Sequence, residues 1–378
     1  MKIIYIFLLL FVFLISCKTK EKSFELEQIE INLRETPRIE VDSIIEDISL
    51  VPLETSENCL IHHVDKIKLY ENKIYILDRK SASIFIFSKT GKFLYKVFNQ
   101  GRGSGEYIMI ADFDIRPGTG DIYVLDAMTD RLLVFENEKF SKSYKLDFNA
   151  KITNLCFLGE NKIAFENQIS TEIDSLKYYL FITDLNLNLI SKNIHYNRSN
   201  SLILSPVSPF SLFDDIISYL PIYNDTVYHI VKSEIVPTYK LDFGNNWIDE
   251  EYLFNKKLNP NNFFNDLKKL NSVYFVNLIE SSTHVFVYFT FKDEKLAFLY
   301  DKKVKRGLFI KNYMKDGCGY NGLPLTPDGE EFLGIVNPYE LSNINKEKIF
   351  RLFPKLDNIK AKQNYILSFI KFKKISTL

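Results

Sequence analysis

The chain has 378 residues, and its 48 lysines and arginines balance its 48 aspartates and glutamates. A balanced charge with no basic patch argues against a nucleic-acid-binding protein. Aromatic residues are abundant, with 32 Phe and 22 Tyr beside a single Trp. The chain has four cysteines and no CxxC pair, so a zinc site is unsupported; apart from Cys17 they lie far apart, and at most one disulfide can form among Cys59, Cys156 and Cys318.

The first residues predict export and a lipid anchor. Lys2 precedes an unbroken apolar run at 3–15, which is shorter than the ~20 residues that a membrane-spanning helix needs. A basic start, a short apolar core and a small residue before the cut are typical of a secretory signal. The run ends in Leu-Ile-Ser before Cys17, which resembles the bacterial lipobox, whose cysteine is diacylated and becomes the new N-terminus. We predict a signal peptide at 1–16 and lipidation of Cys17; a plain signal peptide is the alternative.

Residues 17–23 form a polar tether between the lipid and the folded body, with lysines at 18, 20 and 22. More than one acyl chain gives stable attachment to a membrane. We therefore expect a protein of the cell envelope, lipid-anchored at the outer membrane. The tether has no acidic cluster that would indicate surface display, and periplasmic against surface-facing orientation stays open.

Two stretches of the chain repeat at one offset. Ile-Tyr-Ile-Leu-Asp at 74–78 matches Ile-Tyr-Val-Leu-Asp at 122–126, and Ile-Phe-Ile-Phe at 84–87 matches Leu-Leu-Val-Phe at 132–135. Both offsets are 48 (123 − 75 = 48 and 135 − 87 = 48). A fixed offset across two strands and their turn indicates a structural repeat. The mature chain of 362 residues (378 − 16 = 362) is long for one simple core, a limit that repeat folds escape.

The repeat predicts an all-β fold. Short aromatic and β-branched runs bounded by Asn, Asp, Gly and Lys indicate strands, and units of roughly 40–50 residues with four strands are typical of propeller blades. We predict a single six-bladed β-propeller of four-stranded antiparallel blades over residues 24–378. The predicted blades span 61–98, 107–148, 152–196 (a degenerate repeat), 210–243, 272–313, and 331–336 with 365–373.

Two segments break the β pattern, and the two ends of the chain offer spare strands. Acids early, lysines late and a Pro between predict short helical insertions at about 247–270, and a similar pattern predicts one at 345–356. Strand candidates at 24–33 and 48–53 precede the first blade, and 365–372 lies at the far end. Pairing N-terminal and C-terminal strands in one blade would remove exposed edges and close the ring.

The Gly-Arg-Gly-Ser-Gly-Glu-Tyr stretch at 101–107, followed by Asp112-Phe113 and by residues 122–126, resembles the six-bladed β-propeller lipoproteins of Gram-negative bacteria, which are distantly NHL-repeat-like. The resemblance covers most of the mature chain. It implies the fold and an envelope location, and no particular reaction. Three further stretches fit it: Val-Pro-Leu-Glu-Thr at 51–55, Asn-Asp-Thr-Val-Tyr at 224–228 and Leu-Asp-Phe-Gly at 241–244.

The Gly-Arg-Gly-Ser-Gly-Glu-Tyr loop at 101–107 has two interpretations. Its backbone N–H groups and Arg102 could bind an anion, although it lacks the Gly-Lys-Ser/Thr ending of a P-loop. The interpretation that we favour is a tight crossover between blades one and two, with Glu106 and Tyr107 bonded into the neighbouring blade. That interpretation predicts a positive φ at one or more of the glycines.

Carboxylates recur at two kinds of position. Asp78 and Asp126 end equivalent strands, where a carboxylate accepts N–H groups of the next turn; a Ca²⁺-binding ring of carboxylates is the alternative. Asp112 and Asp114 alternate on the predicted inner strand of blade two, so both could face the channel. The five histidines show no metal-ligand spacing. We expect no cofactor, with calcium as the alternative.

Two functions fit this sequence. The first is a non-catalytic binding or scaffold propeller for a glycan, a peptide or an envelope protein. The second is a metal-dependent channel-site enzyme, a lyase or a lactonase-type hydrolase. No Gly-x-Ser-x-Gly elbow is present and no Ser/His/Asp set is evident, so no catalytic residue is predicted and binding is favoured. The candidate ligand-binding residues are Arg102, Glu106, Tyr107, Asp112 and Asp114.

Overall fold

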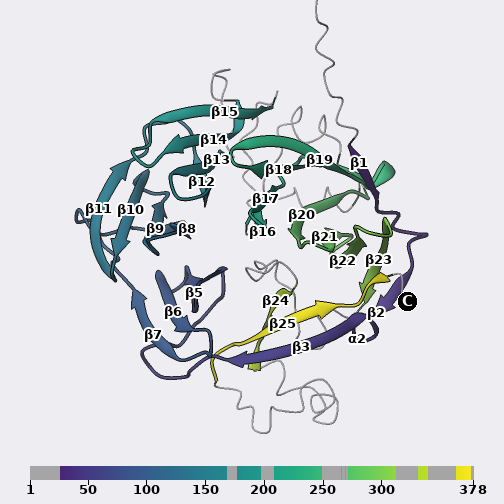
Figure 1. Ribbon diagram of the computed structural model, residues 1–378, viewed down its shortest axis with the longest axis horizontal. Helices are drawn as coiled ribbons and strands as arrows, with labels where there is room; N and C mark the ends of the chain where they lie inside the picture. Colours follow the sequence, from purple (N-terminus) through teal and green to yellow (C-terminus); the bar gives the residue numbers. More distant parts are fainter. Residues whose placement is uncertain are drawn as a thin grey trace, which may run out of the picture.

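The structure, a computed structural model, describes residues 26–167, 177–196, 208–248, 265, 269, 271–311, 331–338 and 363–375. Six sheets stand in a ring about a central axis, which is the predicted six-bladed β-propeller (Figure 1). No helix in the described ranges is both long and apolar enough to cross a bilayer. The predicted signal peptide, Cys17, the predicted insertion at 345–356 and nearly all of the one predicted at 247–270 lie outside the described residues.

Blades one to three are four-stranded antiparallel sheets whose strands follow one another from the axis outward (Figure 1). Blade three has the same regular order, so its repeat is degenerate in sequence alone. The strands of blade one are β4 (Lys66–Tyr70), β5 (Lys73–Asp78), β6 (Ser83–Ser88) and β7 (Phe93–Val97). Those of blade two are β8 (Ile110–Ile115), β9 (Ile122–Asp126), β10 (Arg131–Glu136) and β11 (Lys139–Lys145). Those of blade three are β12 (Ile152–Phe157), β13 (Lys162–Asn167), β14 (Tyr178–Asp184) and β15 (Leu189–His195).

Blades four to six also take strands from the N-terminal part of the chain. Blade four contains β16 (Phe210–Phe213), β17 (Ile216–Tyr219), β18 (Thr226–Val231) and β19 (Glu234–Asp242), and β1 (Glu27–Glu30) adds in parallel to β19. Blade five contains β20 (Val273–Glu280), β21 (His284–Phe291), β22 (Glu294–Asp301) and β23 (Arg306–Lys311), and β2 (Arg38–Glu40) adds in parallel to β23. Blade six contains β24 (Phe332–Val336), β25 (Ile366–Phe372) and β3 (Ile45–Pro52).

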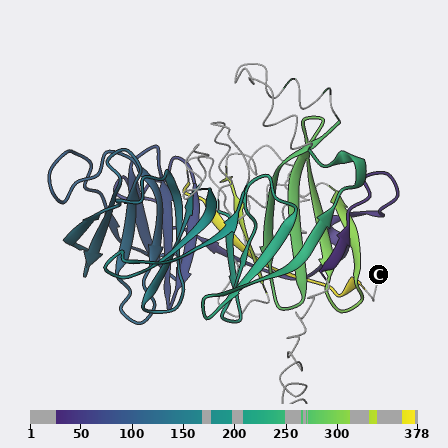
Figure 2. The same ribbon diagram turned by 90° about the horizontal axis from the view of Figure 1, so that it is seen from above.

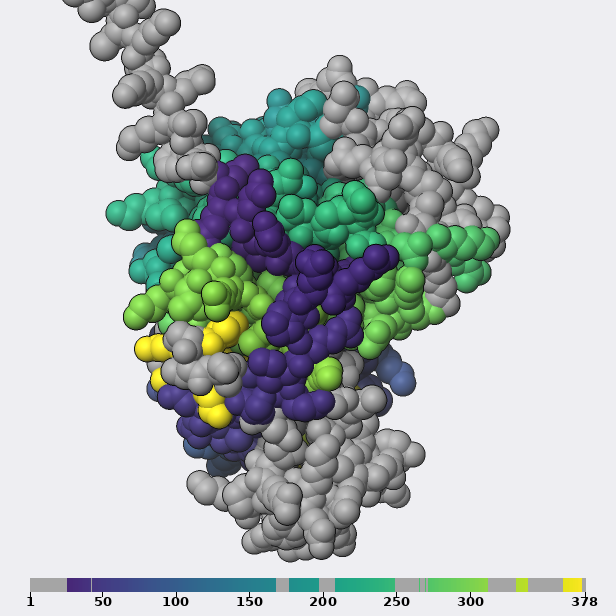
Figure 3. Space-filling model, turned by 90° about the vertical axis from the view of Figure 1, so that its right-hand side faces the viewer, coloured from purple at the N-terminus to yellow at the C-terminus, as the bar shows by residue number. Residues whose placement is uncertain are grey.

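Residues 27–52 therefore form an N-terminal strap across three blades. It contains β1, β2, the short helix α2 (Val41–Ile44) and β3. Figure 3 shows it as a purple band that crosses the outside of the green strands toward the yellow one. The predicted closure is confirmed, because β3 pairs antiparallel with β25 and Ile48 lies opposite Ile370. The 24–33 candidate strand is not part of this closure and pairs with blade four.

The core consists of six apolar clusters, one between each pair of neighbouring blades. The apolar run of β6 explains how one strand serves two of them. Ile84 and Ile86 face blade two, whereas Phe85 and Phe87 face blade six, because successive side chains of a strand point to opposite faces. A sheet covered on both faces needs a continuous apolar run. Seen from the side, the strands run along the axis and the turns form the two rims (Figure 2).

Candidate functional site

Asp112 and Asp114 lie on β8, the inner strand of blade two, and both are buried. Asp112 Oδ1 lies 2.7 Å from Lys66 Nζ, and Asp114 Oδ1 lies 2.9 Å from Lys68 Nζ, with both lysines on β4. The second oxygen of each carboxylate accepts a backbone N–H of β12 at 2.9 Å. Each row of contacts therefore links the inner strands of blades one, two and three. Ligand binding by the two aspartates stays a prediction.

The pair of Asp114 and Lys68 is held in its charged form. Burial opposes ionisation of Asp114, but the Lys68 and Lys66 ammonium groups and the Phe157 N–H outweigh it, so the pKa of Asp114 lies below its usual value. Burial likewise opposes the charge of Lys68, and the carboxylate of Asp114 raises the pKa of Lys68 above the ordinary value. Both oxygens of each aspartate are engaged, which is how a buried ion pair is stabilised.

The glycine-rich loop joins β7 to β8, and Tyr107 holds it to blade one. Tyr107 is fully buried, and its hydroxyl donates to the Ala82 carbonyl at 2.8 Å. The same hydroxyl accepts the Asn99 N–H at 3.0 Å, and the Tyr107 N–H donates to the Asn99 carbonyl at 3.0 Å. These contacts are those expected of a structural crossover.

Arg131 of β10, and not Arg102, fixes the other side of this loop. Arg131 Nη2 donates to the Glu106 carbonyl at 2.6 Å, while Glu106 Oε2 accepts the Gly103 N–H at 2.8 Å. Arg102 is exposed and makes no hydrogen bond or ion pair with any residue in the described ranges. Anion binding by Arg102 stays a prediction.

The expected positive φ in this loop is wrong. None of Gly101, Gly103 and Gly105 has a positive φ. Close approach explains Gly105 instead, because a Cβ there would lie 2.7 Å from Cδ1 of the Phe140 ring. A Cβ at Gly101 would meet only Glu106 Oε2, the far end of a flexible side chain.

Asp78 and Asp126 have the predicted turn contacts and one more. Oδ1 of each carboxylate accepts the N–H two residues on, at 3.0 and 3.1 Å. Oδ2 accepts an N–H of the segment that enters the same blade, from His62 at 2.9 Å for Asp78 and from Ile108 at 3.0 Å for Asp126. The repeated carboxylate thus closes a turn and holds the entry to the inner strand.

Within the ranges that the structure describes, no group of three or more His, Cys, Asp or Glu side chains is arranged to hold a metal ion. Cys59 and Cys156 are buried free thiols, and Cys318 lies outside the described residues. Burial raises the pKa of the Cys156 thiol to about 12, so it is a neutral thiol at physiological pH.

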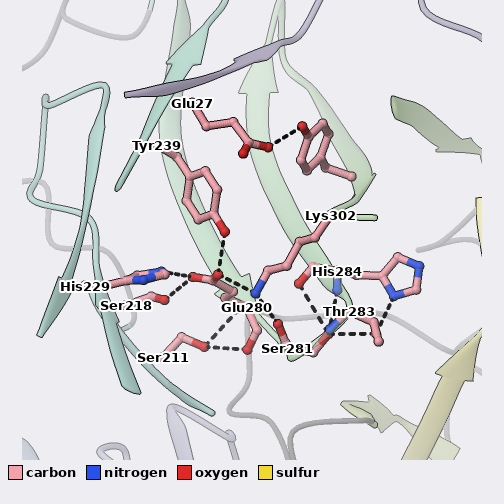
Figure 4. A network of polar contacts seen from close by, with 11 residues as sticks. Glu27, Ser211, Ser218, His229, Tyr239, Glu280, Ser281, Thr283, His284 and Lys302 are labelled. Atoms are coloured by element: carbon pink, nitrogen blue, oxygen red, sulfur yellow. Dashed lines mark hydrogen bonds and ion pairs between the residues drawn. The ribbon is translucent and has the colours of Figure 1, made fainter. Parts of the chain in front are cut away.

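A second polar network lies between blades four and five, around Glu280 (Figure 4). Glu280 is the last residue of β20 and is fully buried. Its Oε2 lies 2.8 Å from His229 Nε2, and its Oε1 lies 2.6 Å from Lys302 Nζ. The Tyr239 hydroxyl donates to Oε1 at 3.2 Å, and the Ser218 hydroxyl donates to Oε2. One carboxylate therefore gathers donors from both blades.

The network continues through the lysine and the backbone. Lys302 Nζ donates to the Ser281 carbonyl at 2.5 Å and lies 4.2 Å from the centroid of the Phe213 ring. Ser211 on β16, the inner strand of blade four, accepts the Glu280 N–H at 3.0 Å. This last contact has the same form as those of Asp112 and Asp114, since a side chain of one inner strand accepts an edge N–H of the next.

Glu280 is held as a carboxylate. Burial opposes its ionisation, but the hydrogen bond from His229 and the charge of Lys302 outweigh burial, so the pKa of Glu280 lies below its usual value. The side chains of His229 and Lys302 are 15% and 18% exposed, so solvent reaches the network from their side. The arrangement joins two blades and also places an imidazole and an ammonium group near solvent.

An aromatic pocket opens between the β17–β18 connection, the segment after β19 and the start of β20. Trp247, Tyr274 and Phe275 contribute rings to it, and Asn224 contributes an amide. None of the described residues that line it carries a charge. Trp247 is the only tryptophan of the chain and stacks on Phe243, with a centroid distance of 5.5 Å.

Backbone strain coincides with this pocket. Phe275 has a φ of 53° and Tyr223 a φ of 57°, which is the left-handed region that bulky residues seldom adopt. The register between β20 and β21 shifts between Tyr274 and Asn277, so a bulge lies at Phe275. Bulges re-aim side chains, and the Phe275 ring is 40% exposed as a result. Strain of this kind gathers at ligand-binding positions.

A family profile described as a domain of unknown function, DUF4934, matches residues 26–371. The chain belongs to the DUF4934 family. The match spans the strap and all six blades, so the DUF4934 domain is the whole propeller. Comparison with curated proteins returns no match.

Two solved structures show what the DUF4934 propeller is similar to. A protein of Bacteroides fragilis described as exported is 20% identical and superposes with a TM-score of 0.79, over 92% of this chain and 100% of that one. A member of the DUF4221 family from Bacteroides vulgatus is 13% identical, with a TM-score of 0.55 over 87% of this chain and 97% of that one. At these identities the likeness shows the fold.

The sequence carried a signal for one network of this DUF4934 propeller and little for the other. Lys66-Ile-Lys68 and Asp112-Phe-Asp114 place charges at alternate positions within apolar strands, which marks buried pairing. Glu280 has no such pattern, because its partners come from four separate elements. The aromatic pocket was likewise missed, although the single Trp, which follows the end of β19, was visible in the sequence.

Proposed function

We propose that this DUF4934 protein is a lipid-anchored propeller of the cell envelope that binds a glycan, a peptide or an envelope protein through an uncharged group held in the aromatic pocket. The pocket is the observation that carries the proposal. Four aromatic residues and one amide line it, and two of the aromatic residues, Tyr223 and Phe275, keep a strained backbone.

The chemistry of the lining favours a neutral group with an apolar face. Burial of apolar surface against the ring faces contributes roughly 25 cal/mol of binding free energy for each Å² that is removed from water. A charged group would lose hydration there and find no opposite charge among the described lining residues. The pocket has a volume of about 30 Å³, so it admits a small apolar group such as a methyl, and the rest of a pyranose face or of an apolar peptide side chain lies across its aromatic rim.

Fluorescence of Trp247 tests the proposal directly, because the chain has one tryptophan and it lines the pocket. Envelope glycans and peptides are titrated into the purified protein, and a saturable change in Trp247 emission is expected. Phe275→Ala should weaken that binding by about tenfold or more, the scale for loss of a buried aromatic anchor.

Phe98→Ala is the matched control. Phe98 is 50% exposed, against 40% for Phe275, and does not line the pocket. It should leave the affinity unchanged. Equal losses in both variants, or a ligand that binds without any change in Trp247 emission, would place the site elsewhere.

The anchor is tested separately. The sequence before Cys17 supports lipidation, and the exported description of the Bacteroides fragilis protein supports an envelope address. Cys17→Ser should abolish labelling by a fatty-acid probe and release the protein from the outer-membrane fraction. Label that persists in the variant would contradict the anchor.

A further inference from the structure

A polar cleft lies at the seam where the ring closes, away from the aromatic pocket. It has a volume of about 440 Å³, within the usual range for small-molecule sites, and lies between blade six and the β6–β7 turn of blade one. Residues 52–55, just after β3, and Thr90 to Lys92 form two of its walls, and Asn364 contributes to a third.

The frame of the cleft is rigid. Asn364 is buried, and its Nδ2 donates to the carbonyls of Glu54 at 3.0 Å and Cys59 at 2.8 Å. The Glu54 N–H donates to the Gly91 carbonyl at 2.8 Å. Gly91 has a φ of 84°, and a Cβ there would overlap the Pro52 carbonyl oxygen, so the two walls meet as closely as a glycine permits. The cleft is therefore preformed.

Two opposite charges line this cleft without pairing with each other. Glu54 Oε2 accepts the Phe93 N–H at 3.1 Å, which fixes the carboxylate and leaves Oε1 with no partner among the described residues. Lys92 Nζ makes no ion pair or hydrogen bond within the described part of the chain. Both side chains are exposed, so each is hydrated and available to a ligand.

We propose that this seam cleft binds a small zwitterion, an α-amino acid or a short peptide, with its ammonium group on Glu54 and its carboxylate on Lys92. The Thr90 hydroxyl, also on the lining, offers a further hydrogen bond. Because its two walls belong to the first and last blades, a ligand here holds the ring closed and stabilises the fold by mass action.

The test uses dialanine and two blocked forms as probes in calorimetric titration and thermal unfolding of the full chain. N-acetyl-dialanine lacks the ammonium group, and dialanine amide lacks the carboxylate. Dialanine should bind and raise the melting temperature, and each blocked form should bind about fivefold more weakly, the scale of one exposed ion pair.

Variants assign the charges. Lys92→Ala should weaken dialanine about fivefold and leave dialanine amide unaffected. Glu54→Gln keeps an acceptor for the Phe93 N–H and should weaken dialanine while leaving the N-acetyl form unaffected. Lys89→Ala is the matched control, because Lys89 is exposed on the same turn but does not line the cleft.

Several outcomes would overturn the proposal. They are no binding of dialanine at millimolar concentration, binding of the blocked forms as tight as that of dialanine, and equal loss in the Lys89 and Lys92 variants. Binding of a neutral disaccharide as tight as that of dialanine would also overturn it, since charge would then not select the ligand. Trp247 emission should stay constant in these titrations, which keeps the result independent of the aromatic pocket.

Discussion

The inner strands of blades one to three are joined by two parallel rows of contacts, whereas blades four and five meet at one carboxylate. In the rows, each aspartate has a lysine on one side and a backbone N–H on the other. At the other junction, Glu280 takes four side-chain donors by itself. Two carboxylates divide the contacts between blades in the repeated rows, whereas Glu280 alone makes them at the second junction. We call Glu280 and its four donors the hub.

Removal of the hub should have the largest effect on stability. Glu280→Ala leaves the Lys302 ammonium group and the donors of His229 and Tyr239 without their acceptor in a buried place. We expect a loss of about 4 kcal/mol in the free energy of unfolding, the scale for breaking a buried ion pair. Urea denaturation followed by circular dichroism measures it.

Glu280→Gln is the control for this variant, because it keeps the shape and one acceptor and removes the charge. Its free energy of unfolding should lie between those of the wild type and the Glu280→Ala variant. A loss below about 1 kcal/mol for the alanine variant would mean that the hub does not hold the two blades together.

Removal of one row should have a smaller effect, because the neighbouring row remains. Asp112→Ala should lower the free energy of unfolding by about 3 kcal/mol, since it leaves the Lys66 ammonium group buried and unpaired. Denaturation of the double variant Asp112→Ala with Lys66→Met tests the reason. That variant should be more stable than Asp112→Ala alone, and an equal or larger loss would contradict the ion-pair explanation.

The crossover between blades one and two adds a third link to this junction. Substitutions of its glycines show whether close packing or backbone conformational freedom is the reason for a glycine there. Gly105→Ala should cost about 2 kcal/mol, because the added Cβ meets the Phe140 ring. Gly103→Ala should change stability by less than about 0.5 kcal/mol, because its nearest neighbour is the Glu106 carboxylate at 3.2 Å, the far end of a flexible side chain. Melting temperatures that fall equally in both would reject close approach as the explanation.

Mild acid should produce the smallest change and affect both regions. Asp114 and Glu280 both have folded-state pKa values below their ordinary values of 3.8 and 4.5. Their contributions are therefore present above the unfolded-state pKa and are lost as the pH falls through the folded-state pKa. We expect the contribution of these two carboxylates to be constant from about pH 7 to pH 5 and to decline below about pH 4, whereas burial lowers the pKa of His284 below its ordinary value of 6.5 and adds a separate loss of stability below about pH 6.5.

Urea midpoints across this pH range provide the measurement. Glu280→Gln should show a shallower decline below about pH 4 than the wild type, because one of the titrating carboxylates is gone. An equally steep decline in both proteins below that pH would contradict the lowered pKa of Glu280.

The sequence predicted what depends on local pattern. The offset of 48 residues identified the repeat, and the apolar runs of β5, β6, β9 and β10 located the middle strands of blades one and two. The spare strands at both ends predicted the closure. The path of residues 27–40 was not predictable, because a parallel strand added at a blade's outer edge leaves no periodic mark in so short a segment.

The sites were predictable to a smaller extent, and for a related reason. Asp112 and Asp114 were identified as a pair by their alternation, but their lysines are 46 residues away and nothing local pairs the two strands. Tyr107 was expected to bond into a neighbouring blade and does so. Arg131, which holds the loop, lies on β10, outside the loop sequence. The prediction therefore named Arg102, which lies within the loop.

The N-terminal strap also sets the order in which the chain can fold. Its pairings join residues that are far apart in sequence: Glu27 with Tyr239 (239 − 27 = 212), Arg38 with Phe309 (309 − 38 = 271) and Ile48 with Ile370 (370 − 48 = 322). The N-terminal strands are synthesised first but pair with strands that are synthesised later, the last of them near the end of the chain. Such non-local pairing slows folding. Blades one to three can form while the chain is still incomplete, but the ring cannot close until its final strand is available.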